Sequence, residues 1–224
     1  MKIIKNKRIL WITIFAITMG IFEAAIVIYL RALYYPTGFD FPLIPIDNTI
    51  AITEIIREFA SLIMLLSVAI LTGKNLSQRF AMFIYSFAIW DIVYYIFLKL
   101  ILNWPESFFS WDILFLLPVT WTGPVISPIV ISLIMILLAL VINKFNKKKH
   151  FSLIINKYEC LLLIGGAFVV FLSFIWDYSK YLISNFNEIK SVSFTDKLFN
   201  LSVKYIPQKF NWILFFVGVA ILLF

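Results

Sequence analysis

The chain has 224 residues, of which 62% are hydrophobic and only 14% are charged. A soluble globular domain is about 45–50% apolar and about 25% charged, so a water-soluble fold of this size could not bury so many apolar side chains. We therefore expect residues 1–224 to form a single polytopic transmembrane domain, with no sizeable water-soluble module among them.

The formal net charge of +7 comes largely from basic clusters that flank apolar runs. The cations of the two largest clusters, before the first run and directly after the fourth, are Lys2, Lys5, Lys7, Arg8, Lys144, Lys147, Lys148 and Lys149. Short basic clusters beside membrane spans lie in the cytoplasm and attract anionic lipid head groups. The lipid bilayer and its anionic lipids are thus the expected partners, and nucleic acid is not, because no groove-reading motif accompanies the charge.

Cysteine and histidine are each present once. Cys160 is the only cysteine, so no internal disulfide can form, and the only histidine, His150, belongs to a basic run. These residues support neither a histidine-based metal site nor a haem site. No glycine-rich phosphate loop is present either, so we expect no cofactor and no metal, with a carboxylate site for a hard cation as the open alternative. No catalytic residue can be assigned.

Apolar runs long enough to cross a membrane recur along the chain. They cover residues 9–33, 50–72, 80–102, 124–143, 158–183 and 208–224. About 20 helical residues cross the hydrocarbon core of a bilayer. The sequence therefore predicts an all-α integral membrane protein with six transmembrane helices. The first run is too long for a signal peptide and is expected to remain as a helix.

The loops between these runs predict how the protein is oriented. Residues 1–8, 73–79 and 144–157 carry lysine and arginine but no acid, whereas the alternate loops carry the acids. The positive-inside rule places the basic loops, and with them both termini, in the cytoplasm. We therefore expect a multi-pass protein of the cell membrane.

Residues 105–123 do not fit a full span. Their apolar stretch at 113–117 is too short to cross, and Pro105, Pro118 and three tryptophans interrupt or surround it. Tryptophan favours the membrane interface, and irregular backbone inside a membrane must be shielded by protein. Two interpretations stay open: a half-helix or re-entrant segment in the outer leaflet, and a loop that lies flat at the interface.

The first and third spans share a residue pattern. FEAAIVIYLRALYYP at 22–36 and WDIVYYIFLKLILNWP at 90–105 each run from an aromatic-acid pair to a Leu-cation pair and then to an aromatic-Pro pair. FIWDYSK at 174–180 is a fainter third copy. The pattern predicts an internal helix-hairpin repeat of 9–72 and 80–143, with chance as the alternative in helices built from so few residue types.

Charged residues within the spans gather from mid-membrane outward on this threading. A charge at the centre of a membrane helix costs about 2.5–3.5 kcal/mol, so Asp91 needs a partner, a proton or a water-filled pocket. The candidate ligand- or ion-binding residues are Glu23, Arg31, Glu54, Arg57, Glu58, Asp91, Tyr94, Tyr95, Lys99 and Asp112. Lys99 can extend to the outer interface, and packing is the commoner role for the two tyrosines, although their hydroxyls can also bond a carboxylate or a ligand.

Arg57 is the only cation on the second span, and it lies one turn from Glu54 and beside Glu58. Residues three or four apart share one face of a helix. An arginine also keeps its charge in any environment and can bridge two carboxylates. We expect Arg57 to contact one acid on its own helix and a second on the first or third span, namely Glu23 or Asp91.

Three functions remain open at this point. The leading one is a transporter, or a membrane protein that binds an ion or a small polar solute from the outside. The second is a cofactor-free hydrolase or transferase that processes lipids with a carboxylate pair, Asp91 with Asp112 or Glu23 with Glu58. The third is a structural subunit of a membrane complex, with a homo-oligomeric or other membrane partner, whose charges only hold helices together.

Overall fold

The computed structural model of the chain describes residues 2–145, 157–186 and 194–223. Part of the basic sequence lies outside this description: the side chains of Lys2 and Lys5, and all of Lys147, Lys148, Lys149 and His150. The described residues form two compact units, each of which is built from several stretches of the chain.

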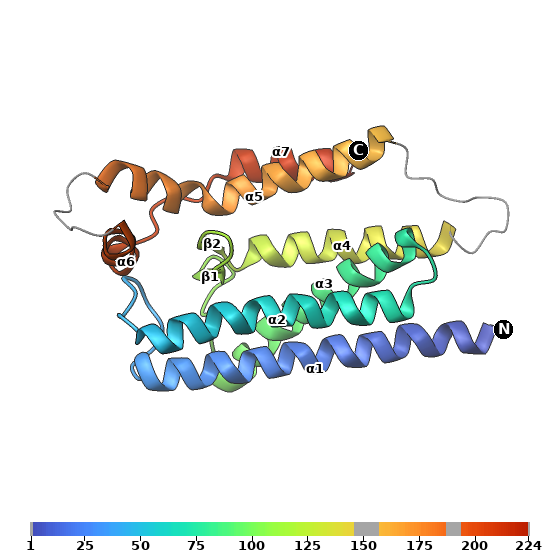
Figure 1. Ribbon diagram of the computed structural model, residues 1–224, viewed down its shortest axis with the longest axis horizontal. Coiled ribbons are helices and arrows are strands. Elements are labelled where there is room, and N and C mark those ends of the chain that lie inside the picture. The colour runs from blue at the N-terminus through green and yellow to red at the C-terminus, as the bar shows by residue number, and fades with distance from the viewer. Residues whose placement is uncertain (1, 146–156, 187–193, 224) are drawn as a thin grey trace. The chain divides into compact units, whose positions relative to one another are not determined.

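Helices make up most of the described chain (Figure 1). Five of them are long, namely α1 (Lys2–Tyr34), α2 (Asn48–Thr72), α3 (Leu76–Leu102), α4 (Ile126–Phe145) and α5 (Lys157–Asn185). The shorter elements are β1 (Trp111–Phe115), β2 (Trp121–Pro124), α6 (Phe194–Lys204) and α7 (Trp212–Leu223). The five long helices are each long and apolar enough to cross a membrane, as expected of a helical transmembrane protein.

A sixth spanning helix is not confirmed. The apolar run at 208–224 yields only the 12-residue helix α7, whose length of about 18 Å is well short of the hydrocarbon core. The helix starts late because the N–H groups of Gln208 and Lys209 donate to the carboxylate of Asp177. The side chain of Asn211 then accepts the N–H of Leu214 and caps the new helix.

Residues 111–124 form an antiparallel β-hairpin, called the hairpin below, so the half-helix interpretation of 105–123 is wrong. Whether the segment is re-entrant or lies at the membrane interface stays open. Trp111 pairs with Pro124 and Ile113 with Thr122, and the register then shifts before the last pair. Aromatic and β-branched residues favour strands, and Pro118 in the turn cannot donate a helical hydrogen bond. Hydrophobic periodicity alone cannot distinguish a short helix from a hairpin here, because the apolar stretch is short.

The first unit comprises Met1–Ile28, Phe59–Ser110 and Val125–Cys160. Its core joins buried residues of α1, α2, α3 and α4, and these are Ile12, Ala69, Ala81, Met82, Ile84, Ala139 and Ile142. Gly20 allows α1 to approach α3 closely, because a Cβ atom there would lie 2.7 Å from the carbonyl oxygen of Trp90.

The basic ends of the first unit lie together. Arg8 on α1 donates to the carbonyl of Thr72 at the end of α2, over 3.1 Å. Figure 1 places the start of α1, the turn from α2 to α3 and the end of α4 at the same end of this unit. Lys144 lies in the last turn of α4. This arrangement fits basic loops that share one membrane face, while the orientation itself stays a prediction.

The second unit comprises Tyr29–Glu58, Trp111–Pro124 and Leu161–Phe224. Its interior is rich in aromatic rings. Trp121 of β2 stacks on Phe174 of α5, with 5.9 Å between ring centroids, and lies 4.9 Å from Phe171. Phe210 contacts both Phe174 and Phe215. These contacts pack the hairpin against α5 and the segment between α6 and α7.

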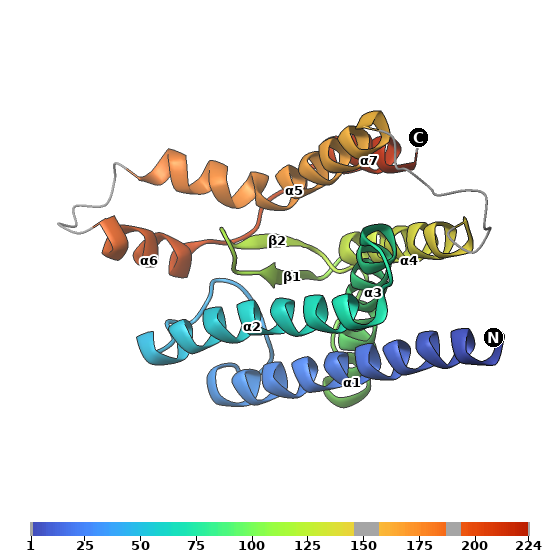
Figure 2. The ribbon, with the colours of Figure 1, turned by 45° about the vertical axis from the view of Figure 1, so that its right-hand side comes forward.

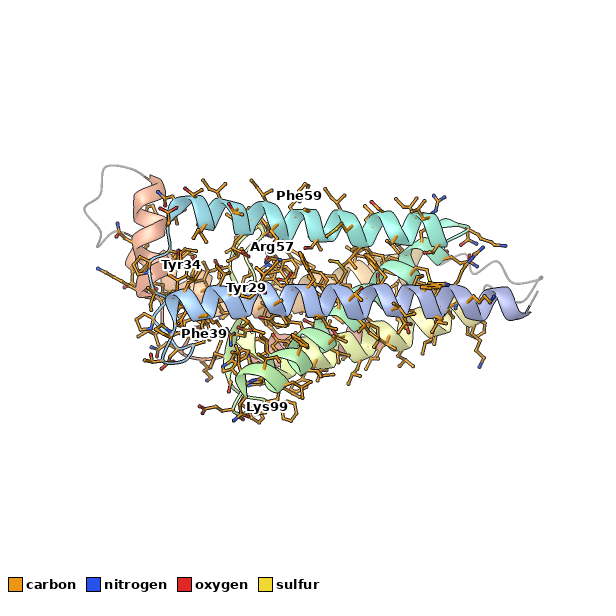
Figure 3. All side chains as sticks on the ribbon, turned by 90° about the horizontal axis from the view of Figure 1, so that it is seen from below. Tyr29, Tyr34, Phe39, Arg57, Phe59 and Lys99 are labelled. Carbon is orange, nitrogen blue, oxygen red and sulfur yellow. The ribbon has the colours of Figure 1, made fainter. Side chains whose placement is uncertain are left out.

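Large apolar side chains remain exposed along the long helices. Leu71 is 84% exposed, Leu33 71% and Phe59 57%, and Phe59 projects outward from α2 in Figure 3. Exposed apolar surface on this scale is unfavourable in water but is the normal surface of a helix in lipid, where hydrocarbon is the solvent. The surface therefore agrees with the membrane-spanning lengths of the helices.

Candidate functional site

Arg31 and Asp112 form a buried ion pair that ties α1 to the hairpin. Arg31 lies in the last turn of α1 and Asp112 is the second residue of β1. The Nη2 atom of Arg31 is 3.3 Å from Oδ1 of Asp112, and the two side chains are 9% and 3% exposed. The ring of Phe39 covers the guanidinium, with 4.4 Å from its centroid to Cζ, a cation–π contact that offsets part of the lost hydration.

Glu54 and Arg57 form a second ion pair within the first turns of α2. Nε and Nη2 of Arg57 lie 2.8 Å and 2.7 Å from Oε2 of Glu54, as the spacing of three residues on a helix permits. The expected contact of Arg57 with an acid of its own helix is therefore present. Its expected contact with Glu23 or Asp91 stays a prediction.

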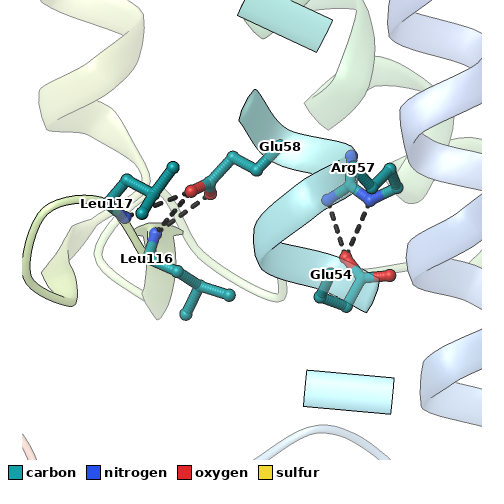
Figure 4. A network of polar contacts seen from close by, with 5 residues as sticks. All are labelled: Glu54, Arg57, Glu58, Leu116 and Leu117. Atoms are coloured by element: carbon teal, nitrogen blue, oxygen red, sulfur yellow. Dashed lines mark hydrogen bonds and ion pairs between the residues drawn. The ribbon is translucent and has the colours of Figure 1, made fainter. Parts of the chain in front are cut away.

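The side chain of Glu58 binds backbone N–H groups at the turn of the hairpin (Figure 4). Its carboxylate accepts the N–H of Leu116 at 3.0 and 3.2 Å and the N–H of Leu117 at 3.1 Å. Pro118 follows and has no N–H to donate. Glu58 thus receives the last two donors before the turn, and charge-assisted bonds of this kind are about twice as strong as neutral ones.

Tyr205 joins the hairpin to α5. Its hydroxyl donates to Oδ2 of Asp177 over 2.9 Å, so it accepts the hydroxyl hydrogen of Thr122 on β2, 3.0 Å away. Both Thr122 and Tyr205 are about 1% exposed. The carboxylate of Asp177 also accepts the backbone N–H groups of Gln208 and Lys209. One carboxylate therefore orders the link from α6 to α7 and, through Tyr205, the hairpin.

The hairpin is thus fixed by polar side chains from three directions in the second unit. Arg31 binds the start of β1, Glu58 binds the backbone that follows it, and Tyr205 binds β2. Figure 2 shows the two strands beside the chain that leads out of α6. Several charges that the sequence marks as costly in a membrane therefore position non-helical backbone.

One donor on the hairpin remains unsatisfied. The indole Nε1 of Trp121 is buried and has no hydrogen-bond acceptor among the residues that the structure describes. Buried indole N–H groups normally find an acceptor, and leaving one unpaired costs about 1–3 kcal/mol. The hairpin therefore presents a hydrogen-bond donor that the described protein does not use.

The first unit holds the remaining candidates. Oδ2 of Asp91 on α3 accepts the hydroxyl of Ser132 on α4 over 2.8 Å. Lys99 lies near the end of α3 (Figure 3), where its Nζ donates to the carbonyls of Asn103 and Pro105 at 3.2 and 2.8 Å. Lys99 therefore caps the end of α3. This position agrees with the low energetic cost expected for a lysine that can extend to the membrane interface.

Glu23, Tyr94 and Tyr95 also lie in the first unit. Glu23 is half-buried on α1. The rings of Tyr94 and Tyr95 contact each other edge to face, with centroids 4.9 Å apart, and Tyr95 also packs near Trp104. This packing is the commoner role considered for these tyrosines. Their binding to a ligand stays a prediction.

Shifted pKa values outside the spanning helices include those of Asp47, Tyr35 and Tyr205. The backbone N–H of Thr49 bonds Asp47 at the start of α2 and lowers the pKa of that carboxyl. Burial raises the pKa of Tyr35, whose hydroxyl accepts the N–H of Ile44. Burial also raises the pKa of Tyr205, so this hydroxyl stays protonated and keeps its proton for Asp177.

The carboxylates offer limited support for acid–base chemistry. Figure 4 shows Glu54 directed to Arg57 and Glu58 directed to the hairpin, so these two acids bind different partners. Among the residues with described side chains, no group of three or more His, Cys, Asp or Glu could hold a metal ion. The catalytic pairs considered from the sequence, Asp91 with Asp112 and Glu23 with Glu58, stay predictions.

The sequence pointed to some of this arrangement and missed the rest. Asp177 stands in the FIWDYSK segment, which resembles the segment around Asp91 and could have marked it as a candidate. Tyr205, Thr122 and Ser132 carry no charge, so nothing local distinguished them. Comparison with known protein families, characterised proteins and solved structures found no match to this chain.

Proposed function

We propose that this protein spans the cell membrane several times, binds a small polar or ionic solute from the side toward which its intramembrane charges gather, and serves as a transporter or transporter subunit. The observation that carries the proposal is the hairpin in the second unit. It is non-helical backbone in a chain of membrane-length helices, it is anchored by ionisable side chains, and it carries the unused indole N–H of Trp121.

The depth of the anchor supports this function. Glu58 lies ten residues after Asn48, where α2 begins, so it is about 15 Å along the helix axis and well inside a hydrocarbon core of about 30 Å. Non-helical backbone at such depth is tolerated only where protein buries it or where it lines a water-filled cavity. Interrupted segments of this kind form the solute sites of many transporters.

The chemistry of the hairpin suggests what the solute carries. A buried indole N–H is satisfied by an oxygen or nitrogen acceptor. A solute with a hydroxyl or carbonyl oxygen can supply that acceptor without a compensating cation. The candidate set contains five acids and three bases, so a proton or a small cation is the natural co-substrate, and deeply placed carboxylates such as Asp91 are suited to carry a proton.

Reconstituted vesicles test the transport proposal directly. Purified protein is placed in liposomes loaded with a pH dye, and a panel of amino acids, sugars, sodium, potassium and phosphate is added outside. We expect at least one solute to produce a protein-dependent flux. Trp121→Phe keeps the aromatic packing and removes the N–H, so it should weaken apparent affinity about three- to tenfold, the effect of one hydrogen bond.

Matched variants separate a solute contact from a general loss of structure. Trp111→Phe changes the other strand of the same hairpin and should leave the apparent affinity unchanged. Asp40→Asn changes a loop acid whose carboxylate accepts a neighbouring backbone N–H and should also transport normally. If no solute of the panel moves, or if Trp111→Phe and Trp121→Phe behave alike, the hairpin is not the solute site.

A structural subunit is the second candidate, and the Arg31–Asp112 pair favours it. Buried ion pairs can fix the arrangement of helices without binding any ligand, and both charges of this pair belong to the chain itself. This function predicts a stable homo-oligomer or complex in native lipid. Native mass spectrometry of lipid nanodiscs would reveal a defined assembly, whereas a monomer in every lipid tested would count against this candidate.

A further inference from the structure

The short helix α6 of the second unit lies nearly perpendicular to α5, the long apolar helix of the same unit. In Figure 1, α5 runs across the view while α6 is seen nearly end-on. Because α5 has the length and composition of a membrane span, a helix perpendicular to it would lie in the plane of the membrane that α5 crosses.

The two faces of α6 differ as an interfacial position requires. Leu201 on one face is buried, as is Tyr205 one turn later, and the hydroxyl of Ser202 bonds Tyr178 on α5 at 2.7 Å. Asn200 and Lys204, also one turn apart, are exposed. The inner face therefore packs on the protein, and the outer face presents polar groups at the level where the spans leave the membrane.

Aromatic rings gather beside α6, at the depth where the spans leave the membrane. The ring of Tyr205 contacts Tyr178 at 5.0 Å, Tyr181 at 5.4 Å and Phe41 at 6.2 Å. Tyrosines gather where a membrane protein passes from hydrocarbon to head groups, because the ring is apolar and the hydroxyl is polar. Tyr205 follows α6 directly, so this helix and the aromatic group around Tyr205 share one depth.

From these observations we infer that α6 is an interfacial helix whose outer face contacts the lipid head groups, and that Tyr205 couples its position to the hairpin. The coupling is the hydrogen-bonded chain from Thr122 through Tyr205 to Asp177, which also holds Gln208 and Lys209. Displacement of α6 from the membrane surface would pull directly on β2. The inference does not depend on solute transport, since it requires only that α5 spans the membrane.

Depth-dependent quenching tests where α6 lies. A Cys160→Ser background carries one new cysteine, Asn200→Cys, labelled with the fluorophore NBD in phosphatidylcholine vesicles with or without phosphatidylglycerol. We expect quenching by a spin label on the lipid head group and little by bromine near the acyl-chain ends. Phe216→Cys on α7 should show the reverse. Quenching of position 200 by aqueous iodide alone would place the helix in water and overturn the interfacial assignment.

Hydrogen exchange tests the coupling. Tyr205→Phe removes both hydroxyl bonds and keeps the ring, so amides of the hairpin and of residues 208–209 should exchange about tenfold faster in vesicles. Tyr178→Phe is the matched control, because it removes a hydroxyl bond to α6 that does not reach the hairpin. Equal effects of the two variants on the hairpin, or no effect of Tyr205→Phe, would overturn the coupling.

Discussion

The guanidinium of Arg31 and the carboxylate of Asp112 pair in the interior of the second unit although 81 residues separate them in the chain. The pair joins a helix end to a strand, and both partners would be costly alone. The contribution of the pair to stability can therefore be measured by removing one charge while the other remains.

Arg31→Leu should destabilise the protein by about 3–5 kcal/mol, because it leaves Asp112 buried without its ion-pair partner. Asp112→Leu should have a similar effect for the same reason. The double replacement should recover much of the loss, since two apolar side chains of matching volume can replace a buried pair at little cost. Thermal unfolding in detergent, followed by circular dichroism, measures all three variants.

The ion-pair interpretation also has a clear contrary outcome. If the double variant is as unstable as the sum of the two single variants, the charges act independently and the pair does not organise this region. Lys99→Leu supplies a control on another helix end. Lys99 is exposed and contacts only carbonyls in the described contacts, so its loss should cost far less.

Glu58→Gln should loosen the turn of the hairpin while the helix α2 stays intact. The amide oxygen of glutamine can still accept an N–H, but the charge that strengthens the bonds to Leu116 and Leu117 is lost. We expect a loss of about 1–3 kcal/mol in stability, with faster amide exchange at these two residues. Hydrogen exchange with mass spectrometry resolves the segment.

Glu106→Gln is the control for Glu58, because Glu106 is an exposed acid in the loop before the hairpin. It should leave exchange in the hairpin unchanged. Exchange at Leu116 and Leu117 that stays at the native rate in Glu58→Gln would show that the charge of Glu58 is unimportant for the turn.

The lengths of the spans could be read from the sequence, and the hairpin could not. Hydropathy and the cost of charges in lipid limit where helices can lie, so the five long helices agree with five of the expected runs. The contacts of the hairpin depend on partners that are 58 and 83 residues apart, Glu58 with Leu116 and Thr122 with Tyr205. No local pattern predicts such pairings.

The candidate site shows the same division. Charges in apolar runs are rare, so Arg31, Glu58 and Asp112 could be selected from the sequence. Which of them pair, and that Glu58 binds backbone rather than another side chain, required the fold. Tyr205 was missed because a tyrosine in an apolar chain usually has a packing role, and only its contacts with Thr122 and Asp177 distinguish it.

The start of α2 should loosen in acid through Asp47. The N–H of Thr49 lowers the pKa of this carboxyl in the folded protein. The carboxylate therefore stabilises the helix start above its unfolded pKa of about 3.9, and the stabilisation is lost as the pH falls through the lower folded value. Amide exchange at Thr49, corrected for the intrinsic effect of pH, should rise over that range.

Asp47→Asn is the matched control for the acid effect, because asparagine also caps helices but does not titrate there. Its exchange at Thr49 should show no step in the same range. A step of equal size in both proteins would assign the acid sensitivity to another group.

Arg57→Leu tests whether Arg57 holds acids beyond its own helix. The loss of Arg57 leaves Glu54 without its ion-pair partner in a part-buried position, so we expect a marked loss of stability in detergent, toward about 3 kcal/mol. Combining it with Glu54→Gln should recover part of that loss.

If the recovery is complete, Glu54 is the only one of these acids that Arg57 neutralises. If a further gain requires Glu23→Gln or Asp91→Asn, Arg57 also neutralises that acid, as the sequence predicts. If no combination is more stable than Arg57→Leu alone, none of these acids depends on Arg57, and the expectation that Arg57 neutralises acids of two helices is wrong.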